Sequence, residues 1–290
     1  TRRRRQRQMC IRDRDWQNIV SDPDRPLLDR TTNGLYPPGS IYKMIVAIEL
    51  LEKKLVDEDW TATCTGEYEF YDRVHKCWDE NGHGVVDVES AIAQSCDVYF
   101  YEAIQKVRLN NLEKRSMDFY HGIPTGIDLP SEMKGKVPNR KYMNKLYGRY
   151  GWSTGAMLNI SIGQGEILVT PIQMAAYVNI LATKGVSNKL HLVKTEINED
   201  LKSISVNPKT WEIIHNSMRE VVYGKKGTGK LSNPNIPGVL VSGKTGTAEN
   251  PHGETHAWYI GFADYYSKDM ISVVVLVENG GGGGSIASPI

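Results

Sequence analysis

The chain has 290 residues, of which 40% are hydrophobic, so it can fold as one large domain or two modest ones. Its formal net charge is +1, but the first fourteen residues contain seven Arg and only one Asp. That segment carries +6 and the remainder of the chain carries −5. This balance argues against a nucleic-acid-binding protein, because such proteins present a basic surface to the phosphates.

The arginine-rich segment at residues 1–14 can be a nucleic-acid arm, a membrane-surface patch or a juxtamembrane flank. Residues 9–14 (MCIRDR) also resemble a translated remnant of a sequencing adapter. We favour the last interpretation, exclude residues 1–14 from the fold as a non-native leader, and expect Cys10 to be unpaired. No apolar run approaches the roughly 18 residues that a membrane helix requires.

After an irregular lead-in at residues 15–36, a helix is predicted over residues 40–54, because a Pro-Pro-Gly sequence precedes it and an apolar stripe follows. Ser40 and Lys43 lie three residues apart and share one face of this helix. A serine hydroxyl becomes a nucleophile when a neighbouring base takes its proton, and the positive end of the helix dipole disfavours the charge on Lys43. The pair is a candidate nucleophile and base, although such a pair alone is more often an ordinary first turn.

Residues 57–86 form a polar insertion that is rich in aromatic residues and cysteine. Three of the four cysteines bracket a histidine, in the order Cys64, Cys77, His83, Cys96. Three thiolates and an imidazole can form a tetrahedral zinc site. Two alternatives stay open: a disulfide between Cys64 and Cys77, or buried thiols that pack as small hydrophobic groups with His83 in a loop.

Residues 88–120 are predicted to be mostly helical, with Asp87 as the N-cap of the first helix. Ser95 and Asp97 then fall at a junction between two helices. Taken alone, Ser95 ends one helix and Asp97 caps the next. Beside the pair at Ser40, they become candidate catalytic residues.

The remainder of the chain changes from loops to helices and then to strands. Residues 121–169 are rich in Gly, Pro and Tyr and are predicted to be loops. Helices are predicted from Pro171 to about Gly185 and from Pro208 onwards. Strands are predicted at residues 239–248, 258–265 and 271–278, with a further possible strand at 190–197. Strands gathered after helices indicate an α+β fold with a mainly antiparallel sheet.

The first of these strands contains Lys244, Thr245, Gly246 and Thr247. Its glycines let a substrate backbone lie close alongside, and the Lys charge and Thr hydroxyls suit a carboxylate. The order Ser-x-x-Lys, Ser-x-Asp, Lys-Thr-Gly-Thr matches the serine acyltransferases that react with penicillin. These three motifs together therefore predict one acyl-transfer site.

On residues 34–40 (GLYPPGS), 159–165 (NISIGQG) and 243–253 (GKTGTAENPHG), the chain resembles the transpeptidase domain of the class B penicillin-binding proteins. The resemblance is strongest to the penicillin-binding protein 2 branch and extends from about Trp16 to the end of the chain. It implies the α+β fold shared with serine beta-lactamases, with an all-helical subdomain, over residues 15–290. Many relatives have Asn where this chain has Asp97, which leaves open whether that side chain donates hydrogen bonds or only accepts them.

The resemblance also implies a role for each motif. Ser40 would attack a D-alanyl-D-alanine stem peptide, Lys43 would accept its proton, and Ser95 would pass a proton to the leaving amine. Lys244, Thr245 and Thr247 would hold the terminal carboxylate. Backbone N–H groups of Ser40 and Thr247 would form an oxyanion hole.

Some relatives of this branch carry a zinc site built from Asp, His and Cys in this insertion. The resemblance implies a zinc ion held by Cys64, Cys77, His83 and Cys96 within the insertion at 57–96, with Cys64 and Cys77 where those relatives use Asp. Such a site would be structural, with every coordination position filled by protein. The disulfide and free-thiol alternatives stay open at this point.

The implied function is a peptidoglycan D,D-transpeptidase that acts on stem peptides, is acylated by beta-lactams and contacts membrane proteins of the elongation machinery. The implied location is the periplasmic face of the bacterial inner membrane, with the anchor outside this sequence. Two alternatives remain. One is a serine beta-lactamase or D,D-carboxypeptidase, which needs a base for deacylation; no Glu lies in an obvious motif for that role, and Glu166 stays open as a candidate. The other is a non-catalytic beta-lactam sensor or scaffold.

Overall fold

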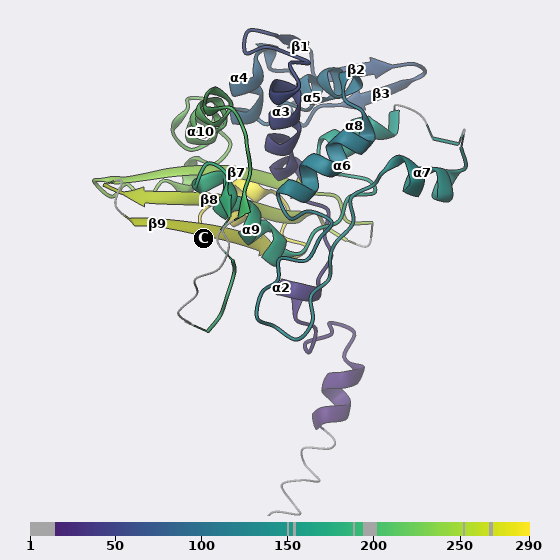
Figure 1. Cartoon of the computed structure of the whole chain (residues 1–290), viewed down its shortest axis with the longest axis vertical. Helices are drawn as coiled ribbons and strands as arrows, with labels where there is room; N and C mark the ends of the chain where they lie inside the picture. Colours follow the sequence, from purple (N-terminus) through teal and green to yellow (C-terminus); the bar gives the residue numbers. More distant parts are fainter. Residues whose placement is uncertain are drawn as a thin grey trace, which may run out of the picture.

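A computed structural model describes residues 15–149, 151–152, 155–187, 189–193, 202–251, 253–266 and 269–290. The predicted leader at 1–14, with Cys10, lies outside the described residues. A three-stranded sheet forms the lower part of the molecule, and a mainly helical region lies above it (Figure 1). The predicted α+β class is thereby confirmed.

The sheet is antiparallel and has the strand order β7-β8-β9, as the sequence predicts. Along β8, Trp258, Ile260 and Phe262 face the main core, while Ala257 and Tyr259 face the opposite side and pack against the C-terminal segment. This alternation follows from the two-residue period of a strand. The strand bounds are β7 Val239–Ala248, β8 His256–Tyr265 and β9 Asp269–Val277.

Two helices cover the sheet, with α10 against β7 and α9 against β8 and β9 (Figure 1). Both begin where the sequence predicts. Thr170 and Gln173 form a capping box at α9, Asn207 caps α10, and each helix has Pro in its first turn. Their bounds are α9 Pro171–Ala182 and α10 Pro208–Tyr223.

The helical region surrounds α3, which is buried on nearly all sides from Lys43 to Leu50. A helix that is apolar all round belongs in a core, and α3 lies at the centre of this region (Figure 1). The capping box of Asp87 and Ser90 confirms the predicted helix start there. The helices and 3₁₀ segments up to residue 118 are α2 Arg30–Asn33, η1 Gly39–Tyr42, α3 Lys43–Glu52, α4 Val88–Ala93, α5 Asp97–Ala103, η2 Ile104–Lys106 and α6 Leu109–Asp118.

The insertion adds strands to this region, which is therefore not purely helical. Strand β1 pairs with β4, and β2 pairs with β3 in a hairpin. A further short pair, β5 with β6, lies near the start of α10 in the sequence. The bounds are β1 Ala62–Cys64, β2 Glu67–Phe70, β3 Arg73–Lys76, β4 Gly84–Val86, β5 Val186–Ser187 and β6 Lys202–Ser203.

Several local predictions were wrong. The lead-in contains a helical segment at 15–21, and two helices interrupt the predicted loops, α7 Arg140–Tyr147 and α8 Gly155–Ser161. Helix α7 buries only Met143 and depends on a cap, in which the Asn139 side chain accepts from the Tyr142 N–H at 2.7 Å. So little apolar periodicity gives a weak helix signal.

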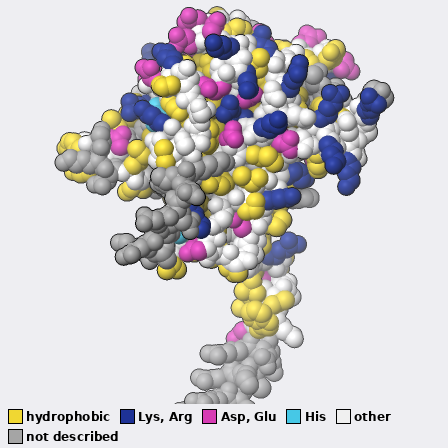
Figure 2. Space-filling model, in the orientation of Figure 1, with side chains coloured by type: hydrophobic (Ala, Val, Ile, Leu, Met, Phe, Trp, Pro, Cys, Tyr) yellow, Lys and Arg dark blue, Asp and Glu magenta, His cyan; other side chains and the backbone are white. Residues whose placement is uncertain are grey.

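The possible strand at residues 190–197 is not formed at 190–193, and its other residues lie outside the described part of the chain. Two further short elements are η3 Lys230–Ser232, between α10 and β7, and η4 Gly283–Ala287, after β9. No helix in the described part of the chain has both the length and the apolar character of a bilayer span. Figure 2 shows basic and acidic side chains interspersed over the top of the helical region, with mainly basic side chains at its right edge.

Candidate active site

Ser40 lies in the 3₁₀ turn η1, directly before the buried helix α3. Gly39 has φ +58° and donates its N–H to the Gly163 carbonyl at 2.9 Å. A Cβ at Gly39 would lie 2.7 Å from the Thr247 carbonyl oxygen, so only glycine lets the nucleophile turn approach β7 this closely. The sequence predicted one helix from residue 40, whereas the α-helix itself begins at Lys43.

The Lys43 amine is fully buried and points at the junction between α4 and α5. Its Nζ donates to Asp97 Oδ1 at 2.7 Å and to the Ser95 carbonyl at 2.8 Å, with Ser95 Oγ at 3.4 Å. The ring of Phe100 lies 5.5 Å from the same nitrogen. A buried amine needs such a counter-charge and acceptors, and this junction supplies both.

Asp97 accepts two hydrogen bonds in this arrangement. Oδ1 accepts a hydrogen bond from Lys43 Nζ, and Oδ2 accepts one from the Trp78 backbone N–H at 3.1 Å. Both partners are donors, so the Asp97 carboxylate accepts hydrogen bonds from them. The sequence had left open whether this side chain, which many relatives replace by Asn, donates or only accepts. Ser95 beside it has φ +58°, a conformation that non-glycine residues adopt rarely and often at functional sites.

Lys244 is the second fully buried amine. Its Nζ donates to Ser95 Oγ at 2.9 Å and to the Thr245 carbonyl at 3.0 Å. Burial, together with the nearby Lys43 charge, holds the pKa of Lys244 well below its usual value. The Ser95 hydroxyl thus lies between the Lys43 and Lys244 amines. These contacts form a short polar path from the helix that follows Ser40 to β7.

These groups border a cleft of about 580 Å³. Ser40, Ser95 and Asp97 line it on one side, and Thr245 and Thr247 on the other. Lys43 and Lys244 lie behind these walls because both are fully buried. The hydroxyl groups of Thr245 and Thr247, rather than the Lys244 ammonium, are therefore the parts of the predicted carboxylate site that this structure presents to the cleft.

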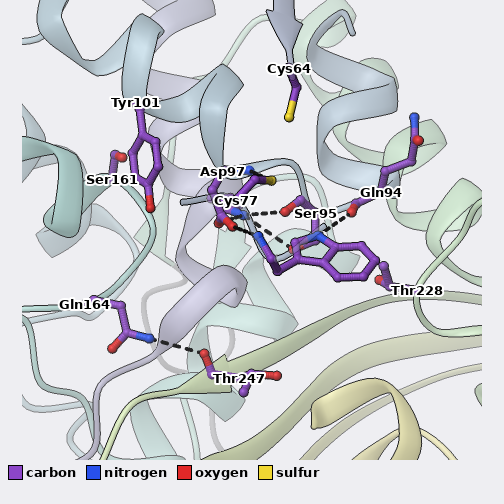
Figure 3. Close-up of polar contacts among 12 residues, drawn as sticks. Cys64, Cys77, Gln94, Ser95, Asp97, Tyr101, Ser161, Gln164, Thr228 and Thr247 are labelled. Atoms are coloured by element: carbon purple, nitrogen blue, oxygen red, sulfur yellow. Dashed lines mark hydrogen bonds and ion pairs between the residues drawn. The ribbon is translucent and has the colours of Figure 1, made fainter. Parts of the chain in front are cut away.

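Three lining residues were missed by the sequence analysis: Gln164, Thr228 and Trp78. Gln164 Nε2 donates to the Thr247 carbonyl at 3.2 Å, and its Oε1 accepts the Glu249 N–H at 3.3 Å (Figure 3). The Thr228 hydroxyl lies 2.7 Å from that of Thr245. Gln164 occurs in a family-like stretch, but nothing in a single sequence shows that these side chains meet β7.

Trp258, His256 and Glu166 do not line this cleft. Trp258 is buried and donates from Nε1 to the Pro37 carbonyl at 3.0 Å, so it supports the turn before Ser40 rather than binding substrate. Its neighbour His256 packs edge-on against Tyr36. Glu166 accepts hydrogen bonds from the Tyr142 and Tyr147 hydroxyls and lines a second cleft, not the one that contains Ser40.

The four predicted zinc ligands come together in the described part of the chain. Their ligand atoms all lie within 4.8 Å of one another, and all four side chains are buried. His83 Nδ1 is 3.4 Å from Cys64 Sγ and 3.5 Å from Cys77 Sγ. Tetrahedral zinc with its usual bond lengths would separate sulfur and nitrogen ligands by about 3.6 Å. The donor set therefore fits a zinc ion.

The thiols are free in this structure, which does not support the alternative disulfide between Cys64 and Cys77. A hydrogen bond with the Cys96 thiol holds the pKa of Cys77 well below that of an ordinary thiol. The Asp97 backbone N–H also donates to Cys77 Sγ at 3.4 Å. The cluster is thus joined directly to the Ser95–Asp97 junction at the cleft.

The sequence matches the penicillin binding protein transpeptidase domain family over residues 6–290. The chain belongs to this family. It is 32% identical to the peptidoglycan D,D-transpeptidase MrdA of Haemophilus influenzae, over 97% of this chain and 47% of that protein. It spans about half the length of the curated relatives that it matches first.

The structure is similar to those of two solved members of the family. Penicillin-binding protein 2 of Pseudomonas aeruginosa, in complex with WCK 5153, matches with a TM-score of 0.87 and 33% identity, over 95% of this chain and 61% of that chain. Penicillin-binding protein 2 of Helicobacter pylori, in complex with MreC, matches with a TM-score of 0.86 and 32% identity, over 95% and 52%. The resemblance to the penicillin-binding protein 2 branch is thereby confirmed.

Proposed function

We propose that this domain is a peptidoglycan D,D-transpeptidase that works through an acyl-enzyme on Ser40. One observation carries the proposal: Ser40 lies in a cleft whose two walls are joined by the contacts of Lys43 and Lys244 with Ser95. Relatives named as peptidoglycan D,D-transpeptidases support it.

In the proposed first step, Ser40 Oγ forms a bond to the carbonyl carbon of the penultimate D-Ala. The peptide C–N bond breaks and the terminal D-Ala leaves as an amine. Lys43, once it has given up the proton of its ion pair with Asp97, takes the serine proton as a neutral amine, and Ser95, which contacts both buried amines, relays a proton to the leaving group. Thr245 and Thr247 face the cleft where the terminal carboxylate would bind.

In the second step, the amine of a neighbouring stem peptide attacks the acyl carbon, and Ser40 leaves with its proton restored. Beta-lactams would acylate Ser40 in place of the first substrate. The predicted oxyanion hole uses the backbone N–H groups of Ser40 and Thr247, both of which line the cleft.

We also propose that Cys64, Cys77, His83 and Cys96 hold a structural zinc ion. When bound, zinc would supply a fixed tetrahedral crosslink and no open coordination position. The support is the burial and closeness of the four donor atoms, together with their fit to zinc–ligand lengths. Because Cys96 lies between Ser95 and Asp97, such a crosslink would hold the junction that orients Lys43.

The proposed cellular setting is the periplasmic face of the inner membrane, with membrane proteins of the elongation machinery as partners. The complex of the Helicobacter pylori relative with MreC supports this setting. The hydrolase alternative requires a base beside the acyl-enzyme. Glu166 is turned into the second cleft and is held there by two tyrosine hydroxyls, which favours transfer over hydrolysis.

Intact mass spectrometry after incubation with a fluorescent penicillin tests the proposal. We expect one covalent adduct on the native chain and none on Ser40→Ala, with the two proteins melting at similar temperatures. A label that survives Ser40→Ala would refute the site. Release of the label within minutes would favour a beta-lactamase, and a stable label without crosslinking of lipid-linked precursor would favour a sensor.

A further inference from the structure

A second cleft of about 440 Å³ continues from the first along two shared walls. Strand β3 and the two residues after it line both, with Arg73 and His75 in the second cleft and Lys76 to Trp78 in the first. The segment that follows α8 does the same, with Gly165 and Glu166 in the second cleft and Ile162 and Gln164 in the first. The two clefts are therefore neighbouring parts of one surface groove.

The lining of the second cleft suits a peptide. The ring of Tyr71 is 79% exposed at the turn of the β2–β3 hairpin and packs edge-on against Phe70, with the ring centres 4.6 Å apart. Exposed aromatic rings at a cleft commonly bind apolar groups of a ligand. Asp72 and Arg73 are both exposed and place a negative and a positive charge beside these rings. A peptide that carries an amine and a carboxylate can pair with both charges.

Side-chain hydrogen bonds hold the wall opposite the hairpin. Tyr142 and Tyr147 of α7 hold the Glu166 carboxylate, and Met143 beneath them is buried. Helices α7 and α8 lie beside the β2–β3 hairpin at the right of Figure 1. The groove is thus built between secondary-structure elements, and its volume falls in the usual range for ligand sites.

The position of the groove decides which peptide it receives. The donor carboxylate is proposed to lie at Thr245 and Thr247, so the donor occupies the β7 side of the first cleft. The second cleft adjoins the first at Lys76 and Gln164, where the segments after the β2–β3 hairpin and after α8 pass from one cleft to the other. An acceptor that attacks the Ser40 acyl carbon must approach from a side that the donor leaves free.

We propose that the second cleft binds the acceptor stem peptide, with its amine directed toward Ser40 and its carboxylate-bearing part beside Arg73. This inference rests on the proposed transpeptidase function. Arg73 is well suited to a carboxylate because its guanidinium can form two parallel hydrogen bonds. Tyr71 would cover the aliphatic part of the same peptide.

Arg73→Glu and Tyr71→Ala test the proposal, since both side chains are exposed and neither contributes to the core. A thioester analogue of the D-Ala-D-Ala end serves as donor, and thiol release reports acylation. Two acceptors are compared: an amine-bearing stem peptide and free D-alanine, which is too small to reach the second cleft. Arg140→Glu is the matched charge reversal, on an exposed residue of α7 outside both clefts.

For Arg73→Glu, we expect the KM for the peptide acceptor to rise about tenfold and transfer to D-alanine to change less than twofold. Tyr71→Ala should give the same selectivity with a smaller effect, and Arg140→Glu should affect neither acceptor. Equal effects on both acceptors, or none, would overturn the proposal. Slower thiol release in Arg73→Glu would instead place the donor in the second cleft. If the native chain forms no acyl-enzyme, the proposed function is refuted and this inference falls with it.

Discussion

Two polar clusters meet at the Ser95–Asp97 junction and differ in their access to solvent. Ser95 and Asp97 face the amines of Lys43 and Lys244 and line an open cleft. Cys96, between them, faces a closed cluster of buried thiols and His83 (Figure 3 shows Cys77 beside Asp97 and Cys64 above them). One three-residue junction therefore presents two candidate catalytic side chains to the cleft, while its middle residue ties the junction to the buried thiol cluster.

The comparison explains how a strained junction can be held. The positive φ of Ser95 costs free energy, and such a conformation persists only where the surroundings fix it. The Lys43 amine at the start of α3 holds the junction through the Ser95 carbonyl and the Asp97 carboxylate, and the thiol cluster holds it through Cys96. Breaking either cluster should therefore affect the other.

The largest effect should come from Lys43→Met. Loss of the base should lower acylation by a fluorescent penicillin about 1,000-fold. The change also leaves the Asp97 carboxylate without its ammonium partner, which costs about 3–5 kcal/mol of stability for a buried pair. Acylation kinetics and thermal unfolding measure the two losses.

The double variant Lys43→Met/Asp97→Asn separates these effects, because it removes both charges. We expect it to recover much of the lost melting temperature and none of the acylation. A double variant that acylates at the native rate would show that Lys43 only stabilises the fold.

The closed cluster is tested by Cys64→Ser. We expect the native chain to carry one zinc per molecule by native mass spectrometry and the variant to carry none. Loss of the crosslink should lower the melting temperature by roughly 10 °C and slow acylation while Ser40 remains intact. A native chain that is free of zinc, or a variant with unchanged melting and acylation, would contradict the proposal.

His121 sharpens the comparison because it is buried but belongs to neither cluster. Burial lowers its pKa to about 4, and its Nδ1 donates to the Phe119 carbonyl at 2.9 Å. Between pH 6.5 and 4 the unfolded chain binds a proton at this residue that the folded chain does not. Stability should therefore fall as the pH is lowered through this window, by about 3 kcal/mol in total.

Chemical denaturation at pH 7 and pH 4 measures this change. His121→Gln should be less stable at pH 7 but should show a smaller loss on acidification. An unchanged pH dependence in this variant would assign the acid sensitivity to other groups.

The smallest effect should come from Gln164→Ala, which removes two hydrogen bonds of the loop after α8, one with Thr247 of β7 and one with Glu249 directly after that strand. At about 0.5–1.5 kcal/mol for each neutral hydrogen bond, acylation should fall about tenfold with little change in melting temperature. Gln105→Ala, on an exposed residue outside the cleft, is the matched control. Equal acylation by both variants would show that Gln164 does not position Thr247.

The sequence predicted most of the elements that carry strong local signals. The starts of α4, α9 and α10 follow from their caps and prolines, and the three strands of the main sheet follow from their periodicity. Helices α7 and α8 were missed because α7 buries a single side chain and α8 is only seven residues long. The predicted catalytic and metal residues converge in space, and their chemical roles stay predictions.

By itself, the sequence determined the family, the α+β class and the identity of the three motifs, because residue type and spacing along the chain are local properties. The tertiary structure decided that Lys244 is buried behind Ser95, that Gln164 and Thr228 contact β7, and that Glu166 lines the second cleft rather than the part of the groove that contains Ser40. These facts depend on contacts between segments that are 17 to 149 residues apart in the chain. No local pattern encodes such contacts, since burial and packing of the whole domain set them.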